Sequence, residues 1–421
     1  MTNGPHQRRG LFGSFGPAII VASVVLGPGS ILTSSRVGCE FGYELLWVVV
    51  LAGVLMVAMT ALAARIGVTL DGTPGDEIAR RAGRPFAVFV GVVLFLVVAC
   101  FQFSNNIAIV AALEPYAGDG KAWRVILLAV LNGAILAVLF GFRRLYRPVE
   151  TMMKLLVGIM LLGFLGNVVM ARPSVGAILG GLLPRLPESL VGSFFPTRVD
   201  GEIVDPLQSV QGLIATTFSV AGAFYTAYLV RQKGWSRADL QRGLVDSVVG
   251  ISVLAFLTLT IMVTAAAVLH GRIAPADLGS AAQVAAQLEP LFGEWAGLLF
   301  SLGLLAGGLS SFLVNVMIGG TVLSDGLGLG GDMDHRWPKL LTATALLIGF
   351  GVALTALDAR PVNLIVFAQA LTVLGNPVLA GVLLWLSTRM PTPRWIQVCA
   401  VLGFLLVLVL AARTGARLYL S

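Results

Sequence analysis

Polar and helix-breaking residues stand together near the start of this sequence, inside a segment that is otherwise apolar. Gly27-Pro28-Gly29 is followed directly by Ser30. Proline lacks a backbone N–H and crowds the carbonyl one turn back, and glycine accepts backbone angles that are closed to other residues. A helix interrupted at Gly27, Pro28 and Gly29 would present carbonyl and hydroxyl oxygens to a solute, and such oxygens suit hard cations. A kinked packing helix is the alternative interpretation.

A second weak point lies in the stretch TTFSVAGAFYTAYLV, where Thr216 and Ser219 precede the small residues Ala221 and Gly222. We predict that the helix breaks at Ala221 and Gly222, and that Thr216 and Ser219 contact a solute. Two interrupted helices at corresponding positions of two halves are typical of inverted-repeat transporters, whose substrate lies near the membrane midplane between the breaks.

A third polar cluster, in CFQFSNNIAIV, contains Gln102, Ser104, Asn105 and Asn106. Amides and hydroxyls inside a membrane helix either line a polar cavity or hold helices together through interhelical hydrogen bonds. So many polar residues within one and a half turns exceed what helix contacts require. The sequence therefore favours cavity lining by Asn105 or Asn106, with helix contacts as the alternative.

The segments that carry these residues are long and apolar. Hydrophobic residues make up 57% of the 421 residues and charged residues 12%, with a mean hydropathy of +0.91. A soluble domain is roughly 45–50% apolar and about 25% charged. Blocks long enough to cross a membrane predict an all-α membrane protein of eleven helices, near residues 15–35, 43–66, 86–112, 122–142, 148–171, 207–231, 243–270, 291–323, 338–357, 361–387 and 394–415.

Most of the 28 basic residues fall in alternate loops, and basic residues resist translocation. We therefore predict a multi-pass protein of the bacterial inner (plasma) membrane, with a cytoplasmic N-terminus and the C-terminus outside. Contact with anionic inner-leaflet lipid explains the net charge of +7, so the lipid bilayer is an expected partner and nucleic acid is not. The chain shows no nucleophile motif, phosphate loop or zinc spacing, so neither an enzyme nor a cofactor is expected.

The spans divide the chain into five predicted parts. They are a cytoplasmic tail (1–14), a first five-helix repeat (15–171), an extracellular loop (172–205), a second five-helix repeat (206–387), and an eleventh helix with the C-terminus (388–421). Asp246 follows a basic run and is a candidate intracellular gate. Arg36 and Glu40 lie four residues apart near the predicted outer mouth, where they could pair and control entry.

Several long stretches resemble the NRAMP (natural resistance-associated macrophage protein) family of divalent-metal transporters. They are GPGSILTSSRVGCEFGYELLWVVVLA, AARIGVTLDGTPGDEIARRAG and GLLAGGLSSFLVNVMIGGTVLSDG, and Gln369 in FAQALTVLGNPV matches a glutamine of the family's tenth span. The resemblance covers nearly the whole chain. It implies a LeuT-type bundle of two inverted five-helix repeats plus one extra helix, which agrees with the eleven spans.

The departures from the family pattern fall on its metal site, so the chain resembles a divergent prokaryotic member that lacks the usual metal-site motifs. The family's metal-binding aspartate corresponds to Gly27 and its asparagine to Ser30. Its methionine corresponds to Ser219 and its alanine ligand to Thr216. Its two histidines correspond to Ala221 and Thr226, and amides and a serine replace the acidic residues of its third span.

Three functions remain open. The leading one is alternating-access transport of a hard divalent cation, Mg²⁺ before Mn²⁺, without the usual proton coupling, because hydroxyls and amides replace the soft sulfur and the titratable groups. Ser30, Thr216 and Ser219 would contact the metal. A second keeps the fold and moves a small organic, anionic or zwitterionic solute. A third is a non-transporting, sensor-like relative. The full set of predicted contacts is Gly27, Ser30, Asn105, Asn106, Thr216, Ser219 and Gln369.

Overall fold

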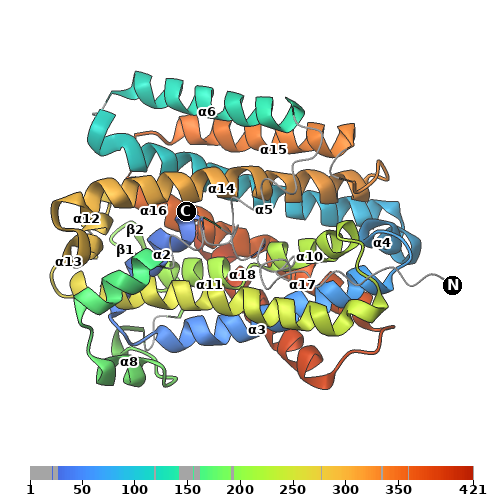
Figure 1. The fold of residues 1–421 in the computed structure, drawn as a ribbon, viewed down its shortest axis with the longest axis horizontal. Helices are drawn as coiled ribbons and strands as arrows, with labels where there is room; N and C mark the ends of the chain where they lie inside the picture. Colours follow the sequence, from blue (N-terminus) through green and yellow to red (C-terminus); the bar gives the residue numbers. More distant parts are fainter. Residues whose placement is uncertain are drawn as a thin grey trace, which may run out of the picture.

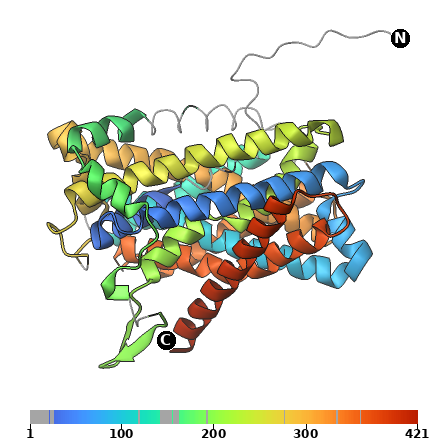
Figure 2. The same cartoon turned by 90° about the horizontal axis from the view of Figure 1, so that it is seen from below.

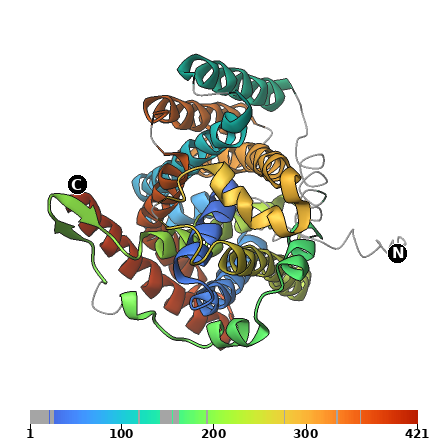
Figure 3. The same cartoon turned by 90° about the vertical axis from the view of Figure 1, so that its left-hand side faces the viewer.

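The computed structural model describes residues 21, 27–117, 120–141, 155, 162–190, 194–275, 277–332, 335–358 and 360–420. Its long helices run side by side in one bundle, which Figure 1 shows from the side and Figure 3 shows along the helix axes. Among these residues, nine helices are long and apolar enough to cross a membrane, or ten if the bent pair Leu162–Ala171 and Val175–Gly181 is one span.

The predicted spans coincide with helices wherever the structure describes them. Most of 15–26 and of 148–161 lies outside the described residues, so the count of eleven stays a prediction. The elements of the first half are α2 (Pro28–Phe41), α3 (Leu46–Thr69), α4 (Pro74–Ala82), α5 (Arg84–Ala117), α6 (Lys121–Gly141), α8 (Val175–Gly181) and η2 (Glu188–Leu190).

The remaining elements begin with a small hairpin in the long loop and end with a long oblique helix (Figure 2). They are β1 (Thr197–Val199), β2 (Glu202–Val204), α9 (Gln208–Thr217), α10 (Val220–Gln232), η3 (Arg237–Asp239), α11 (Leu240–Val268), α12 (Ala281–Ala285), η4 (Ala286–Leu288), α13 (Glu289–Phe292), η5 (Gly293–Trp295), α14 (Ala296–Gly326), α15 (Arg336–Thr355), α16 (Pro361–Leu371), η6 (Thr372–Gly375), α17 (Asn376–Ser387) and α18 (Arg394–Leu420).

Helix α2 begins where the Gly-Pro-Gly stretch predicts a boundary. Gly27 is extended, with φ −72° and ψ −178°, and Pro28 occupies the first helical turn. Proline suits this position because its missing N–H would have no intrahelical acceptor there. The Gly27 carbonyl accepts hydrogen bonds from the backbone N–H of Ser30 at 3.0 Å and of Ile31 at 3.3 Å. The first turn of α2 therefore uses this oxygen, and Gly29 lies inside the helix rather than at its boundary.

The second break also exists, two residues before the predicted one. Phe218 (φ −102°, ψ 67°) and Ser219 (φ −79°, ψ 92°) leave the helical region between α9 and α10. The Ser219 hydroxyl accepts a hydrogen bond from the Gly222 backbone N–H at 3.3 Å and caps α10. The predicted break at Ala221 and Gly222 was wrong, because serine is a preferred cap whereas alanine favours the helix interior.

The interrupted pair α9–α10 forms the centre of the bundle. All of its most apolar stretch is buried inside the protein, whereas only about a fifth of that of α6 is buried. Figure 3 accordingly shows α6 at the edge of the bundle, beyond α15. Phe218, Phe224 and Tyr225 are among the largest fully buried side chains. The break therefore lies where protein, not lipid, surrounds the backbone.

A buried arginine joins the long loop to the C-terminal helix. Arg413 of α18 is 1% exposed and donates hydrogen bonds to Asp205 at 2.6 Å, to Gln211 of α9 at 2.8 Å, and to the Phe194 carbonyl. The hairpin β1–β2 turns at Asp200 and Gly201, which both have positive φ, and leads the chain directly to Asp205. Arg413 thus fixes the loop, α9 and α18 together at one end of the bundle.

We expect Arg413→Leu to destabilise the protein strongly, because it leaves the buried Asp205 carboxylate without this partner. Removing one member of a buried ion pair costs about 3–5 kcal/mol. Thermal unfolding of the purified protein in detergent measures the effect. Arg198→Leu is the matched control, because Arg198 is exposed on β1 and bonds only the nearby Gly201 carbonyl, at 3.2 Å. Equal unfolding temperatures for the two variants would contradict the role assigned to Arg413.

Candidate functional site

The two interrupted helices meet through threonine hydroxyls. Thr33 of α2 and Thr216 of α9 place their hydroxyl oxygens 3.5 Å apart. Thr33 also donates to the Gly29 carbonyl at 2.7 Å, and Thr216 donates to the Leu213 carbonyl at 3.0 Å. Thr216 was predicted from the sequence and Thr33 was missed, although its position one turn after Gly29 could have indicated it. The breaks therefore face each other across neutral oxygens.

Gln369 of α16 packs directly on the first turn of α2. A Cβ atom added to Gly29 would lie 2.0 Å from the Gln369 side-chain nitrogen, so only glycine permits this approach. The same nitrogen donates to the Ser104 hydroxyl of α5 at 2.9 Å. Gln369 therefore bridges α2 and α5, and the requirement for glycine at position 29 comes from packing rather than from a helix break.

Some buried oxygens around the breaks have no hydrogen-bond partner among the described residues. They include the hydroxyls of Ser30 and Thr217 and the side-chain carbonyl of Gln369. A buried polar atom without a partner costs about 1–3 kcal/mol, and native proteins tolerate few of them. A solute or water would supply the missing partners. Ser30 and Gln369, both predicted contacts, therefore remain candidates, and Thr217 joins them.

A small cavity touches the second break. It measures about 20 Å³ and is lined by Thr216, Ser219, Ala221, Gly222 and Asn315, with Val21, Val98, Phe101 and Ile318 as apolar walls. That volume holds about one water molecule. A hydrated ion does not fit, so transport through this site would require the cavity to widen.

The amides of α5 mainly hold helices together. Asn106 donates to the Gln102 carbonyl at 2.8 Å and accepts from Asn132 of α6 at 2.7 Å. Asn105 donates to the Gln102 side chain at 2.9 Å, and Gln102 donates to the Phe312 carbonyl of α14 at 3.0 Å. Neither asparagine lines the small cavity at the second break, here called the break cavity. These bonds support the helix-contact alternative over the cavity lining that the sequence favoured, because each amide found a partner on its own helix or a neighbouring one.

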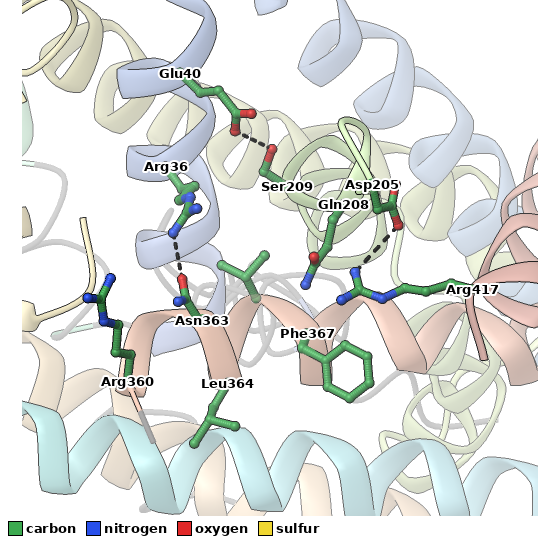
Figure 4. A pocket seen from close by; sticks show the side chains of 11 residues that line it. Arg36, Glu40, Asp205, Gln208, Ser209, Arg360, Asn363, Leu364, Phe367 and Arg417 are labelled. Atoms are coloured by element: carbon green, nitrogen blue, oxygen red, sulfur yellow. Dashed lines mark hydrogen bonds and ion pairs between the residues drawn. The ribbon is translucent and has the colours of Figure 1, made fainter. Parts of the chain in front are cut away.

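A much larger cavity, here called the vestibule, opens at the end of the bundle where α2 and α18 end and α9 and α16 begin (Figure 4). It has a volume of about 470 Å³. Its lining residues are Arg36, Glu40, Asp205, Gln208, Ser209, Arg360, Asn363, Leu364, Val366, Phe367 and Arg417.

Arg36 and Glu40 line the vestibule but do not form the predicted pair. Arg36 donates to the Asn363 side chain at 2.7 Å and to the Leu278 carbonyl at 3.3 Å, and Ser209 donates to Glu40 at 2.7 Å. No ion pair joins Arg36 to Glu40 in the part of the chain that the structure describes. Neighbouring elements, α16 and α9, supply closer partners than the next turn of α2 does.

Comparison with known proteins identifies the family. Residues 18–417 match the family model described as natural resistance-associated macrophage protein-like. The chain belongs to the Nramp family. A curated relative, the divalent metal cation transporter MntH of Deinococcus radiodurans, is 26% identical over 99% of this chain and 92% of its own length. MntH of Klebsiella pneumoniae strain 342 is 26% identical over 95% of this chain and 92% of its own length.

Solved structures confirm the LeuT-type fold. The manganese transporter of Eremococcus coleocola superimposes with a TM-score of 0.74 at 20% identity, over 98% of this chain and 87% of that one. MhsT, solved in complex with L-phenylalanine, superimposes with a TM-score of 0.61 at 15% identity, over 94% of this chain and 98% of that one. This Nramp-family chain is therefore an all-α membrane protein of the predicted class.

The part of this Nramp-family protein that the structure describes shows no acidic metal cluster. Among the described residues, no group of three or more His, Cys, Asp or Glu side chains could hold a metal ion. Gly27, Ser30, Thr216 and Ser219 occupy the positions that the sequence resemblance assigns to the metal, and they offer neutral oxygens alone. Any cation bound between the breaks would therefore meet dipoles and not carboxylates.

A hydrogen-bonded carboxylate closes the opposite end of the bundle. Asp325, near the end of α14, is 1% exposed and accepts hydrogen bonds from Thr73 at 2.7 Å, from the Gly75 backbone N–H at 2.8 Å and from Tyr228 of α10 at 2.7 Å. Sequence analysis did not select it. Thr73 caps the short helix α4. A capped helix start of this kind is the sequence signal that could have indicated a hydrogen-bonding partner at this position.

The candidate gate Asp246 lies elsewhere, in α11, where its side chain is buried. Asp325 joins three elements, namely α14, α10 and the start of α4. A role for Asp246 as a gate stays a prediction. The Asp325 cluster is the stronger candidate for closure at this end.

We expect Gly29→Ala to destabilise the protein, because the new methyl group displaces the Gln369 amide from Ser104. Overpacking of this kind costs about 1–3 kcal/mol. Thermal unfolding measures it, with Gly133→Ala as control, since nothing lies within 4 Å of a Cβ at Gly133. In a Gln369→Ala background the same change should cost much less. An equal cost in both backgrounds would rule out the proposed contact.

We expect Tyr228→Phe to loosen the Asp325 end, because the carboxylate loses one of three hydrogen bonds. A bond worth about 1–2 kcal/mol corresponds to a roughly five- to thirty-fold larger open population. The measurement is the rate of thiol labelling at Ser219→Cys, in a chain whose native cysteines are replaced by alanine. Tyr419→Phe, the same change at an exposed position on α18, is the control. Identical labelling rates in the two variants would count against the role assigned to the Tyr228–Asp325 hydrogen bond.

Proposed function

We propose that this Nramp-family protein is a secondary transporter that moves a hard divalent cation, Mg²⁺ before Mn²⁺, by alternating access between α2 and α9–α10. The observation that carries the proposal is that the polar groups at the breaks are neutral hydroxyls and amides, without sulfur, imidazole or carboxylate among the described lining residues. Hydroxyl and amide oxygens suit Mg²⁺, whereas the softer transition metals gain from sulfur and imidazole ligands. The curated relatives are named divalent metal cation transporters.

The weak charge of the site is compatible with Mg²⁺ only if the ion keeps much of its water. Removing a divalent ion from water without a compensating charge costs tens of kcal/mol by Born estimates. Mg²⁺ gives up its waters reluctantly and is often bound through them. We therefore propose that Ser30, Thr216, Ser219 and Gln369 contact the waters of a hydrated ion in a wider conformation of the break cavity.

We propose further that transport is not coupled to protons in the usual way. Histidine and carboxylates are the common proton carriers inside membranes, and neither residue type lines the break cavity. In the span-three cluster, Gln102, Asn105 and Asn106 stand where the family resemblance places acidic residues, and they are bonded to one another or to backbone carbonyls.

The proposed setting is the bacterial inner membrane with the N-terminus in the cytoplasm. The distribution of basic residues supports it. On this topology the vestibule, the hairpin and the C-terminal end of α18 face outward, and α4 with the Asp325 cluster faces the cytoplasm. The described conformation would then be open outward at the vestibule and closed inward.

One observation favours a second candidate, a small organic, anionic or zwitterionic solute. Arg36, Arg360 and Arg417 all line the vestibule, and a positive mouth attracts anions and repels cations. MhsT, which shares this fold, was solved in complex with L-phenylalanine. The two candidates differ in what crosses the break site, so a flux measurement separates them.

The test is uptake of Mg²⁺ and Mn²⁺ into proteoliposomes that contain the purified protein, with and without a proton gradient, beside empty liposomes. Saturable Mg²⁺ flux that ignores the gradient is expected. Ser219→Met adds a soft sulfur ligand at the break and should shift preference toward Mn²⁺, whereas Gly133→Ala on α6 should change neither flux. Metal flux driven by the proton gradient would refute the uncoupled mechanism, and absence of metal flux would favour the organic solute.

A further inference from the structure

The vestibule brings together three guanidinium groups from distant parts of the chain. Arg36 comes from α2, Arg360 stands just before α16, and Arg417 comes from the last turn of α18. Figure 4 shows them around one cavity, with Arg36 beside Asn363 and Arg417 beside Asp205. Proteins rarely gather like charges around a cavity without a compensating ligand, because the charges repel one another.

The surrounding contacts hold two of these guanidinium groups in place. Arg36 is fixed by the Asn363 side chain at 2.7 Å and the Leu278 carbonyl at 3.3 Å, and both are uncharged acceptors. Arg417 lies over the Phe367 ring at 5.1 Å and reaches Asp205 at 3.4 Å. Groups that are fixed in advance lose less conformational entropy when they bind a ligand.

Two carboxylates also line the vestibule. Asp205 is shared between Arg417 and the buried Arg413, which approaches more closely, at 2.6 Å. Glu40 accepts its hydrogen bond from Ser209, and among the described residues no ion pair joins it to Arg36 or Arg417. The lining therefore carries three guanidinium groups and two carboxylates, one of which also serves a buried arginine.

We propose that the vestibule is a binding site for a small organic di- or tricarboxylate, held by Arg36, Arg360 and Arg417. Guanidinium forks match carboxylate geometry and bind it bidentately. The volume of about 470 Å³ lies within the range of small-molecule sites, roughly 300–1,000 Å³. Leu364, Val366 and Phe367 supply apolar surface for a carbon skeleton. Inorganic phosphate has no carbon skeleton to cover that apolar surface.

The site is independent of the ion that crosses at the breaks. It lies at the mouth of the bundle, and none of its lining residues lines the break cavity. A bound carboxylate neutralises the mouth, which would allow a cation to approach. The same ligand would be the solute itself if the second candidate function holds. The proposal therefore concerns binding, and it can be tested without any transport.

The experiment is isothermal titration calorimetry of the full-length purified protein with citrate and with succinate, in chelator-treated buffer without divalent metal. We expect saturable binding of citrate, weakened by added salt as for other contacts between charges. Arg36→Gln should weaken it at least ten-fold, and Arg36→Lys should restore part of the loss. Arg360→Gln, at an exposed position, repeats the test if Arg36→Gln does not fold. Arg198→Gln, on the hairpin and outside the vestibule, should bind like the unaltered protein.

Three outcomes would overturn the proposal. They are absence of binding by either carboxylate, equal affinity in the Arg36, Arg360 and Arg198 variants, and binding of inorganic phosphate but not of the carboxylates. Because no divalent ion is present, each of these outcomes leaves the proposed cation transport untouched. Failure of metal uptake in proteoliposomes would in turn leave the carboxylate site standing.

Discussion

Satisfaction of backbone hydrogen bonds inside the membrane is the constraint on which this architecture depends. An unpaired peptide group in hydrocarbon costs several kcal/mol, so helices are interrupted only where protein or a polar cavity surrounds them. The α9–α10 break meets this condition, since the most apolar stretch of the span is entirely buried. Ser219 caps α10, and the Gly27 carbonyl begins α2, so each boundary reduces the number of groups left unpaired. Some of the buried oxygens that have no partner among the described residues, those of Ser30, Thr217 and Gln369, lie near these boundaries.

The high cost of charge in hydrocarbon explains how the polar residues are distributed along the bundle. Arg36, Arg413, Arg417, Glu40 and Asp205 gather at one end, and Asp325 with its donors closes the other. Between these ends the described site residues are hydroxyls and amides. Buried charges occur where several partners surround them, as around Arg413, and the centre keeps neutral groups that can exchange partners at a lower cost. This division suits a protein whose centre must open in turn to both sides.

Sequence alone predicted the spans, the family and the two weak points, because hydrophobic length and helix-breaking residues act locally. It placed the second break at Ala221 and Gly222 because small residues suggest loose winding, yet a capping serine decided the boundary. It assigned Asn106 to a cavity because the partner, Asn132, lies on another helix and no local pattern shows the pairing. Arg36, Arg360 and Arg417 could not be grouped from the sequence, because they lie on or next to separate helices far apart in the chain and tertiary packing alone brings them together.

The conformation also limits how the two ends can work together. The vestibule lies at one end, while at the other end Asp325 ties α10 to α14 and to the start of α4. Opening there must separate Tyr228 from Asp325, and it moves α10, whose cap residue Ser219 belongs to the break. The small cavity at the break is lined partly by the same helix, α10. Separation of Tyr228 from Asp325 and widening of the cavity would therefore both require α10 to move. On the proposed mechanism, the loss of hydrogen bonds to Asp325 is offset by new contacts made in the opened state, and the Ser30 and Gln369 oxygens, which have no partner among the described residues, are candidates to make them.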